Sequence, residues 1–202
     1  FFSFFSYWKI APPEFKKVVP GLLLFALFNS SDIFLLLVTK ETIGDKVITL
    51  WQSNFNADTI TIAAYIFYNL VYAAVSYPMG VLADRLGFKR IIILGLILFT
   101  IVYGGFAFSP SILFIFILFS VYGIYAAATE GVIKAWITNL SHHQNTATAI
   151  GFYTSGESVC SLFASIIAGI LWTIWGSAAT FITTAVISLF VAIYLWLIIK
   201  VK

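Results

Sequence analysis

The sequence MGVLADRLGFKR, residues 79–90, separates two apolar runs that are each long enough to cross a lipid bilayer. Gly87 gives the chain the conformational freedom that a sharp reversal needs. Basic side chains near a helix C-terminus and near anionic headgroups are in favourable surroundings, and this stretch supplies three of them, Arg85, Lys89 and Arg90. The stretch therefore predicts a short loop between two transmembrane helices.

The rest of the chain has the composition of a polytopic membrane protein. Its 202 residues are 61% hydrophobic and 9% charged, and the mean hydropathy is +1.03. Soluble domains usually carry about 25% charged residues. Because one crossing takes about 20 apolar residues, the chain has room for roughly six. We expect an all-α bundle of six transmembrane helices.

The apolar runs and the turn signals between them place these helices. Polar residues 29–32 should break the first helix, and Pro20 falls in the expected first turn, where a missing N–H costs little. Residues 39–58 form the one sizeable loop expected on the outer side. The predicted spans are Val18–Val38, Thr59–Leu82, Ile91–Phe108, Ile112–Trp136, Ala147–Trp172 and Ala178–Ile199.

The basic residues are unevenly shared between the two sides. Only Lys40 and Lys46 accompany the outer loop, and short basic loops stay in the cytoplasm. We therefore expect a multi-pass protein of the cell membrane with both termini cytoplasmic. Residues 1–17 would be a cytoplasmic linker or an interfacial segment, and residues 18–202 the bundle. The other basic residues are Lys9, Lys16, Lys17, Arg85, Lys89, Arg90, Lys134, Lys200 and Lys202.

The first residues suggest that more chain precedes them. The only methionine is Met79, so Phe1 is not an initiator, and we expect this chain to be a piece of a longer protein. Residues 1–8 are too short to span a membrane. They are either the tail of a preceding membrane helix or a segment lying on the bilayer surface.

The loop at residues 79–90 resembles the signature G-x-L-x-D-R-x-G-x-[RK]-[RK] of the major facilitator superfamily of secondary transporters. In that superfamily the acidic residue forms a breakable latch between the two halves of the molecule, and the resemblance implies this gating role for Asp84. The alternative is a loop that only sets topology through its positive charge. The matching residues are Gly80, Leu82, Asp84, Arg85, Gly87, Lys89 and Arg90.

The resemblance extends along the chain. Residues 128–136 are similar to the cytoplasmic end of the tenth helix of this superfamily, and residues 148–153 are similar to the start of its eleventh. Together they align the chain with the C-terminal six-helix half. The family's usual Arg-Gly is replaced by Thr146 and Ala147. The charge partner of Glu130 is therefore missing, or Lys134 on the next turn serves in a cytoplasmic ion pair.

Two acidic residues lie deep in predicted spans, where ionisable groups are costly and often functional. By resemblance, Asp32 and Glu157 lie on helices that line the central cavity, where a carboxyl group could exchange a proton as access alternates. Asn29 and Asn69 are polar candidates for the same cavity. The alternative for Asp32 is a structural hydrogen bond in the broken helix. For Glu157 it is snorkelling or pairing across a helix interface.

The resemblance implies secondary active transport of a small organic molecule by a rocker-switch mechanism, with H⁺ coupling and antiport as the expected mode. The partners would be the lipid bilayer, the substrate, H⁺, and either an N-terminal six-helix half or a second copy of this chain. The alternative is a membrane module that does not transport and associates with another bundle.

The sequence lacks the residues that metal binding, nucleophilic catalysis or the use of ATP would need. Adjacent His142 and His143 with one distant Cys160 make a poor metal site. The sequence around Glu157 lacks the second glycine of a nucleophile elbow, and no phosphate-cradling glycine loop is present. We therefore expect no enzyme activity, no metal or other cofactor, no direct use of ATP and no nucleic-acid partner.

Overall fold

The computed structural model describes residues 3–45, 48–50, 53–108 and 111–198. Six helical segments in this part of the chain are long and apolar enough to cross a membrane, the first of them formed by α2 and α3 together. The expected all-α polytopic bundle is confirmed. The elements are α1 (Ser3–Ile10), α2 (Pro13–Phe28), α3 (Ile33–Ile43), β1 (Ile48–Leu50), β2 (Ser53–Phe55), α4 (Ala57–Leu86), α5 (Phe88–Phe106), α6 (Ile112–Leu140), a 3₁₀ turn (His143–Asn145), α7 (Thr146–Trp175) and α8 (Ser177–Ile198).

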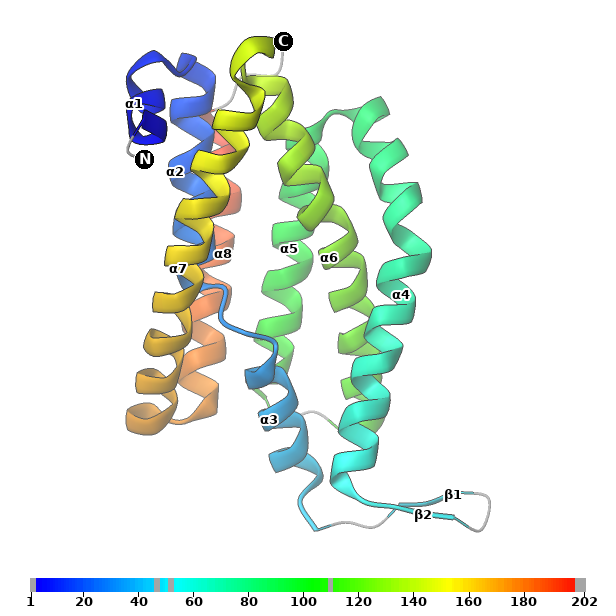
Figure 1. Cartoon of the computed structure of the whole chain (residues 1–202). Coiled ribbons are helices and arrows are strands. Elements are labelled where there is room, and N and C mark those ends of the chain that lie inside the picture. The colour runs from blue at the N-terminus through cyan, green and yellow to red at the C-terminus, as the bar shows by residue number, and fades with distance from the viewer. Residues whose placement is uncertain (1–2, 46–47, 51–52, 109–110, 199–202) are drawn as a thin grey trace.

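The long helices form two groups of three. Helices α2, α7 and α8 pack together, as do α4, α5 and α6, and the contact between α5 and α8 joins the groups (Figure 1). Two hydroxyl groups form hydrogen bonds between these helices. Ser188 of α8 donates to the Leu96 carbonyl of α5 at 3.1 Å, and Thr100 of α5 donates to the Ala185 carbonyl of α8 at 3.4 Å. Such bonds stabilise helix pairs in lipid, where apolar surfaces alone give little preference.

The first span is broken where the sequence predicts. Helix α2 ends at Phe28 and α3 begins at Ile33. Short polar side chains compete for backbone groups, and Ser31 Oγ accepts a bond from the Ile33 N–H at 3.4 Å. Helix α2 packs on α7 and α8, whereas α3 packs on α4. The break therefore carries the chain from one helix group to the other.

The start of this span differs from the expectation. Helix α2 begins at Pro13, five residues before the predicted Val18, so the expected linker residues Lys16 and Lys17 are helical. A proline suits the first helical position because its φ is already helical and its missing N–H would have had no partner there. Pro20 consequently lies inside α2, and the prediction that it occupies the first turn was wrong.

An aromatic cluster fills the space between the two groups. The rings of Phe25 and Phe99 meet edge-on with centroids 5.0 Å apart, and Phe99 stacks on Tyr103 at 4.0 Å. Tyr125 lies 4.7 Å from Phe99 on the other side. Because α2, α5 and α6 each contribute, this cluster fixes how far apart the two groups stand.

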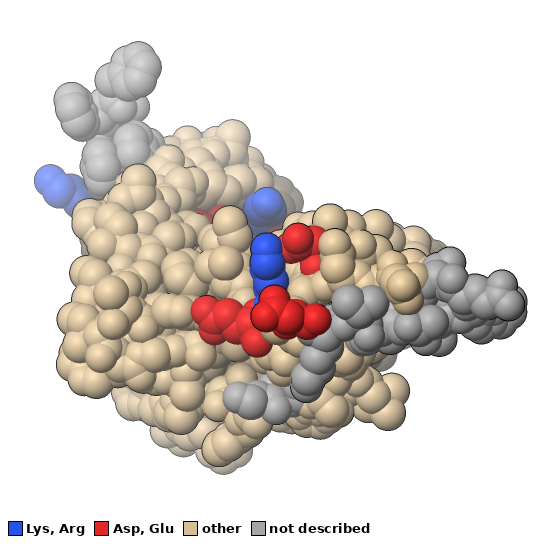
Figure 2. All heavy atoms as spheres, turned by 90° about the horizontal axis from the view of Figure 1, so that it is seen from below, with Lys and Arg blue, Asp and Glu red and all other residues tan. Residues whose placement is uncertain are grey.

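The termini and the α4–α5 connection lie at one end of the bundle, and the β1–β2 hairpin lies at the other (Figure 1). The segment expected to be a loop, residues 39–58, instead continues α3 to Ile43 and then forms the hairpin, with Ile48 opposite Phe55. When the bundle is viewed from the hairpin end, acidic side chains gather beside basic ones (Figure 2).

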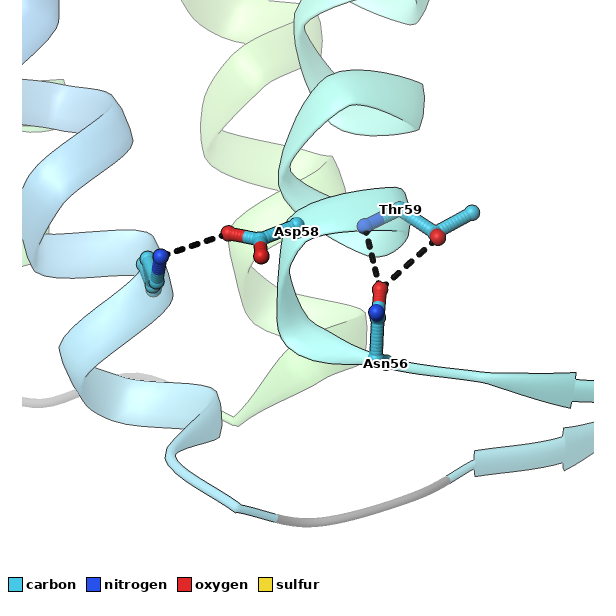
Figure 3. A network of polar contacts seen from close by, with 4 residues as sticks. Asn56, Asp58 and Thr59 are labelled. Atoms are coloured by element: carbon cyan, nitrogen blue, oxygen red, sulfur yellow. Dashed lines mark hydrogen bonds and ion pairs between the residues drawn. The ribbon is translucent and has the colours of Figure 1, made fainter.

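Helix α4 begins at this end with a defined cap. Asn56 Oδ1 accepts bonds from the Thr59 N–H at 2.9 Å and from the Thr59 hydroxyl at 2.8 Å (Figure 3). Asparagine is a preferred N-cap because its side chain satisfies an N–H that has no helical partner. In the next turn Asp58 contacts Lys40 Nζ at 2.7 Å, which ties α4 to α3.

Candidate functional site

A cavity of about 300 Å³ lies between the two helix groups, at the break in the first span. Residues from α2, from the break, from α6 and from α7 form its walls. The lining comprises Phe25, Ala26, Asn29, Asp32, Tyr122, Tyr125, Thr129, Glu130, Ile133, Lys134, Tyr153, Glu157 and Ser161. Five of the polar or charged residues singled out from the sequence therefore meet in one place.

Asp32 is held by a side chain of α6. The buried Tyr122 on α6 donates its hydroxyl to Asp32 Oδ1 at 2.6 Å. One turn earlier in the chain, the Asn29 amide donates to the Tyr125 hydroxyl at 3.3 Å. Tyr122 and Tyr125 are three residues apart and so share a face of α6. Two side-chain bonds thus connect the break in the first span to α6.

Glu157 is held within its own helix. The buried Tyr153, four residues earlier on α7, donates its hydroxyl to Glu157 Oε1 at 3.0 Å. Residues four apart lie on the same helix face, so both side chains reach the cavity together. The two intramembrane carboxyl groups come from different elements, yet each has one oxygen bound by a tyrosine hydroxyl.

Glu130 and Lys134 also line the cavity, one turn apart on α6. Their expected ion pair is absent in this conformation, because Lys40–Asp58 is the one ion pair within 4.0 Å among the described residues. The Glu130 carboxyl lies beside the Tyr72 hydroxyl of α4 instead. Glu130 and Lys134 are both exposed, and separate hydration of such long side chains competes well with pairing.

Asn69 does not join the other candidates. It is exposed on α4, and its amide donates to the Tyr65 carbonyl one turn earlier at 2.8 Å. It is not among the residues that line the cavity. A backbone bond of this kind satisfies the amide without any tertiary partner, so the structure places three of the four predicted cavity residues together.

The candidate gating loop forms a separate feature. Helix α4 ends at Leu86 and α5 begins at Phe88, so the turn consists of Gly87 alone, with φ of 93°. That backbone conformation favours glycine. Lys89 reaches across to α8 and donates to the Trp196 carbonyl at 2.9 Å, whereas Arg85 and Arg90 are exposed.

Beside this turn, a second cavity of about 220 Å³ runs between α4 and α6. Its walls include Gly80, Ala83, Ala127 and Gly131, whose small side chains leave the groove open. Asp84 lies on its edge and is exposed. Within the described residues, no basic group comes within 4.0 Å of this carboxylate.

The tyrosines are the residues that the sequence analysis missed. Tyr153 has a local signal, since it stands four residues before Glu157 on one helix face. Tyr122, Tyr125 and Thr129 also form a polar stripe on an otherwise apolar helix, which indicates a side that avoids lipid. Only the packing of α6 against the broken span reveals which carboxyl and amide groups these hydroxyls meet.

Comparison with known proteins agrees with this architecture. The sequence profile of the Major Facilitator Superfamily matches residues 21–202. An uncharacterized MFS-type transporter of the archaeon Methanocaldococcus jannaschii is 37% identical over 169 residues, which cover 82% of this chain. The chain spans 40% of the length of that relative. Because the family profile covers nearly the whole bundle, the chain belongs to the major facilitator superfamily of multi-pass membrane proteins.

Proposed function

We propose that the chain is the C-terminal six-helix half of a secondary active transporter, which moves a small organic molecule by rocker-switch alternating access coupled to H⁺. One observation carries the proposal: Asp32 and Glu157, from separate elements, line one cavity at a broken transmembrane helix. Broken helices and midplane carboxyl groups are the usual setting of substrate and coupling-ion sites in such carriers.

A second six-helix bundle would complete the pathway. Support comes from the relative, of which this chain spans 40%, and from the segment that contains α7, where only 11% of the most apolar window is buried within the chain. We propose that an N-terminal half covers this side of the cavity. A second copy of the chain is the other way to supply the missing wall.

The gating loop has a role in the same scheme. Among the described residues, Asp84 has no basic group within 4.0 Å, and it stands at the edge of a groove of small residues between α4 and α6. An element of the other bundle that enters this groove could satisfy the carboxylate in one access state and leave it free in the other. The latch would face the cytoplasm, since this end carries most of the basic residues.

The test uses the full-length protein in liposomes under an imposed pH gradient. Currents and internal pH are recorded on addition of a panel of amines, carboxylates and sugars. We expect at least one class to drive H⁺-coupled transport, and Asp32→Asn with Glu157→Gln to abolish the coupling. The matched control is Asp58→Asn with Glu14→Gln, which changes two exposed acids outside the cavity. Coupled transport that persists in the cavity variant would remove both residues as coupling groups, and the absence of both a current and a protein-dependent change of internal pH would contradict transport.

A further inference from the structure

We infer that the cavity binds an organic cation, specifically a protonated amine that carries an aromatic or other apolar group; this inference rests on the transport function proposed above. Its basis is the set of hydrogen-bonding groups that the walls leave unused. They include one carboxyl oxygen each of Asp32 and Glu157, which are acceptors, and the ammonium group of Lys134, which is a donor.

The first unused acceptor is Asn29 Oδ1. The amide nitrogen of Asn29 bonds to the Tyr125 hydroxyl, but Oδ1 is buried and has no hydrogen-bond partner in the described part of the chain. A buried acceptor without a donor costs free energy. An N–H group of a ligand that reached this oxygen would remove that cost.

The two carboxyl groups add further acceptors. Tyr122 occupies Oδ1 of Asp32, and Tyr153 occupies Oε1 of Glu157. Within the described residues no hydrogen bond reaches the second oxygen of either group. The tyrosine hydroxyls hold one oxygen of each carboxyl group, and the other oxygen is left to accept from an external donor.

The charges that face the cavity favour a cation. The break contributes Asp32, α7 contributes Glu157, and α6 contributes both Glu130 and Lys134. Three carboxyl groups against one lysine give the walls a negative balance. An ionised carboxylate is costly away from water, and a bound cation offsets that cost directly.

The remaining walls fit an apolar body. Phe25, Tyr122, Tyr125 and Tyr153 present aromatic rings to the cavity, and such rings attract cations over their faces and pack against flat apolar groups. The volume, about 300 Å³, lies at the lower end of the range for small-molecule sites. An anion would meet three carboxyl groups against one lysine, so the balance of charge disfavours it.

Binding to the full-length protein in detergent, measured by equilibrium dialysis with tritiated 2-phenylethylamine, tests this directly. The competitors keep the phenylethyl body and change the head group: 2-phenylethanol is neutral, 3-phenylpropanoate is anionic, and trimethyl(2-phenylethyl)ammonium is a cation without N–H. We expect the amine to bind at least about tenfold more tightly than the alcohol, the propanoate not to compete, and the quaternary cation to be weaker than the amine. Equal competition by the propanoate would overturn the inference.

Variants locate the site. Asp32→Asn and Glu157→Gln should each weaken amine binding about tenfold, which corresponds to about 1.4 kcal/mol. Asp58→Asn should leave it unchanged. Unchanged affinity in both cavity variants would place the amine elsewhere and refute the assignment. The ligand series on the unmodified protein does not depend on how well the variants fold.

This binding assay needs no pH gradient and no flux. If the full-length protein carries an anion with H⁺ coupling but does not bind the amine, the transport proposal stands and the cation assignment fails. If the amine binds through Asp32 and Glu157 but no compound drives a coupled current or a protein-dependent change of internal pH, the transport proposal fails and the cation assignment stands.

Discussion

Replacing Gly123 with alanine tests whether α4 and α6 are as closely packed as the structure shows. A Cβ atom at this position would lie 2.9 Å from the Tyr68 carbonyl oxygen and 2.9 Å from Val71 Cβ, both on α4. Ordinary contacts between such atoms are about 3.5–4.0 Å, so the two helices must separate by roughly 0.5–1 Å. The carbonyl oxygen belongs to the backbone and cannot turn aside. Overpacking of this kind costs about 1–3 kcal/mol.

Gly104→Ala is the matched control. Gly104 lies within α5, and a Cβ atom there would have no neighbour within 4 Å. Both substitutions change helix propensity by the same amount, so their difference isolates the steric cost. In unfolding titrations with a denaturing detergent, followed by circular dichroism, we expect Gly123→Ala to be less stable than Gly104→Ala by about 1–3 kcal/mol. Equal stability of the two variants would refute the close contact between α4 and α6.

Two further predictions concern the outer end and the cavity. Asn56→Ala should lower the free energy of unfolding by about 1 kcal/mol because it removes the N-cap of α4, whereas Asp58→Ala should cost less than about 1 kcal/mol because its ion pair is exposed. The same titrations measure both, and a larger cost for Asp58→Ala would contradict this ranking. In a Cys160→Ser background of the full-length protein, a membrane-impermeant maleimide should label Ser161→Cys, which lines the cavity, and should not label Val186→Cys, which is 60% exposed on α8 and would face lipid. Equal labelling at the two positions would mean that the cavity is no wetter than the lipid face.

Hydropathy was sufficient to predict the spans. A long apolar run crosses a membrane as a helix because a helix satisfies its backbone hydrogen bonds internally. The break at residues 29–32 was also predictable, because four short polar residues in a row compete for backbone bonds. The start of α2 was not, because the analysis looked for apolar residues, whereas Pro13 and the basic residues after it begin the helix. The hairpin was missed because its two strands are only three residues long.

The candidate site, too, could be predicted from the sequence only in part. Asp32 and Glu157 stand out in the sequence because a carboxyl group in an apolar run is costly wherever it points. Asn69 stood out as another polar side chain in an apolar run, but a backbone carbonyl one turn away accepts a bond from its amide. Whether a polar residue bonds locally or across the cavity depends on helix rotation and tilt, which packing sets. Tyr122 could be identified as polar and inward-facing, but its bond to Asp32 joins residues 90 positions apart.

The two carboxyl groups differ in where their tyrosine partners lie. This difference affects how binding of a proton could be coupled to movement of the helices. Glu157 and its tyrosine both belong to α7, so their bond persists however the helix groups move. Asp32 is the N-cap residue of α3, which packs on α4, and its tyrosine belongs to α6, so their bond joins the broken span to α6. Any rearrangement that separates α6 from the broken span must give up this bond or move Asp32 with it. Protonation or ligand binding at Asp32 therefore changes the relative free energies of two arrangements, which is the condition for coupling. At Glu157 the same events would not act on that contact, so of the two proposed coupling groups we expect Asp32 to have the larger effect on the arrangement of the helices.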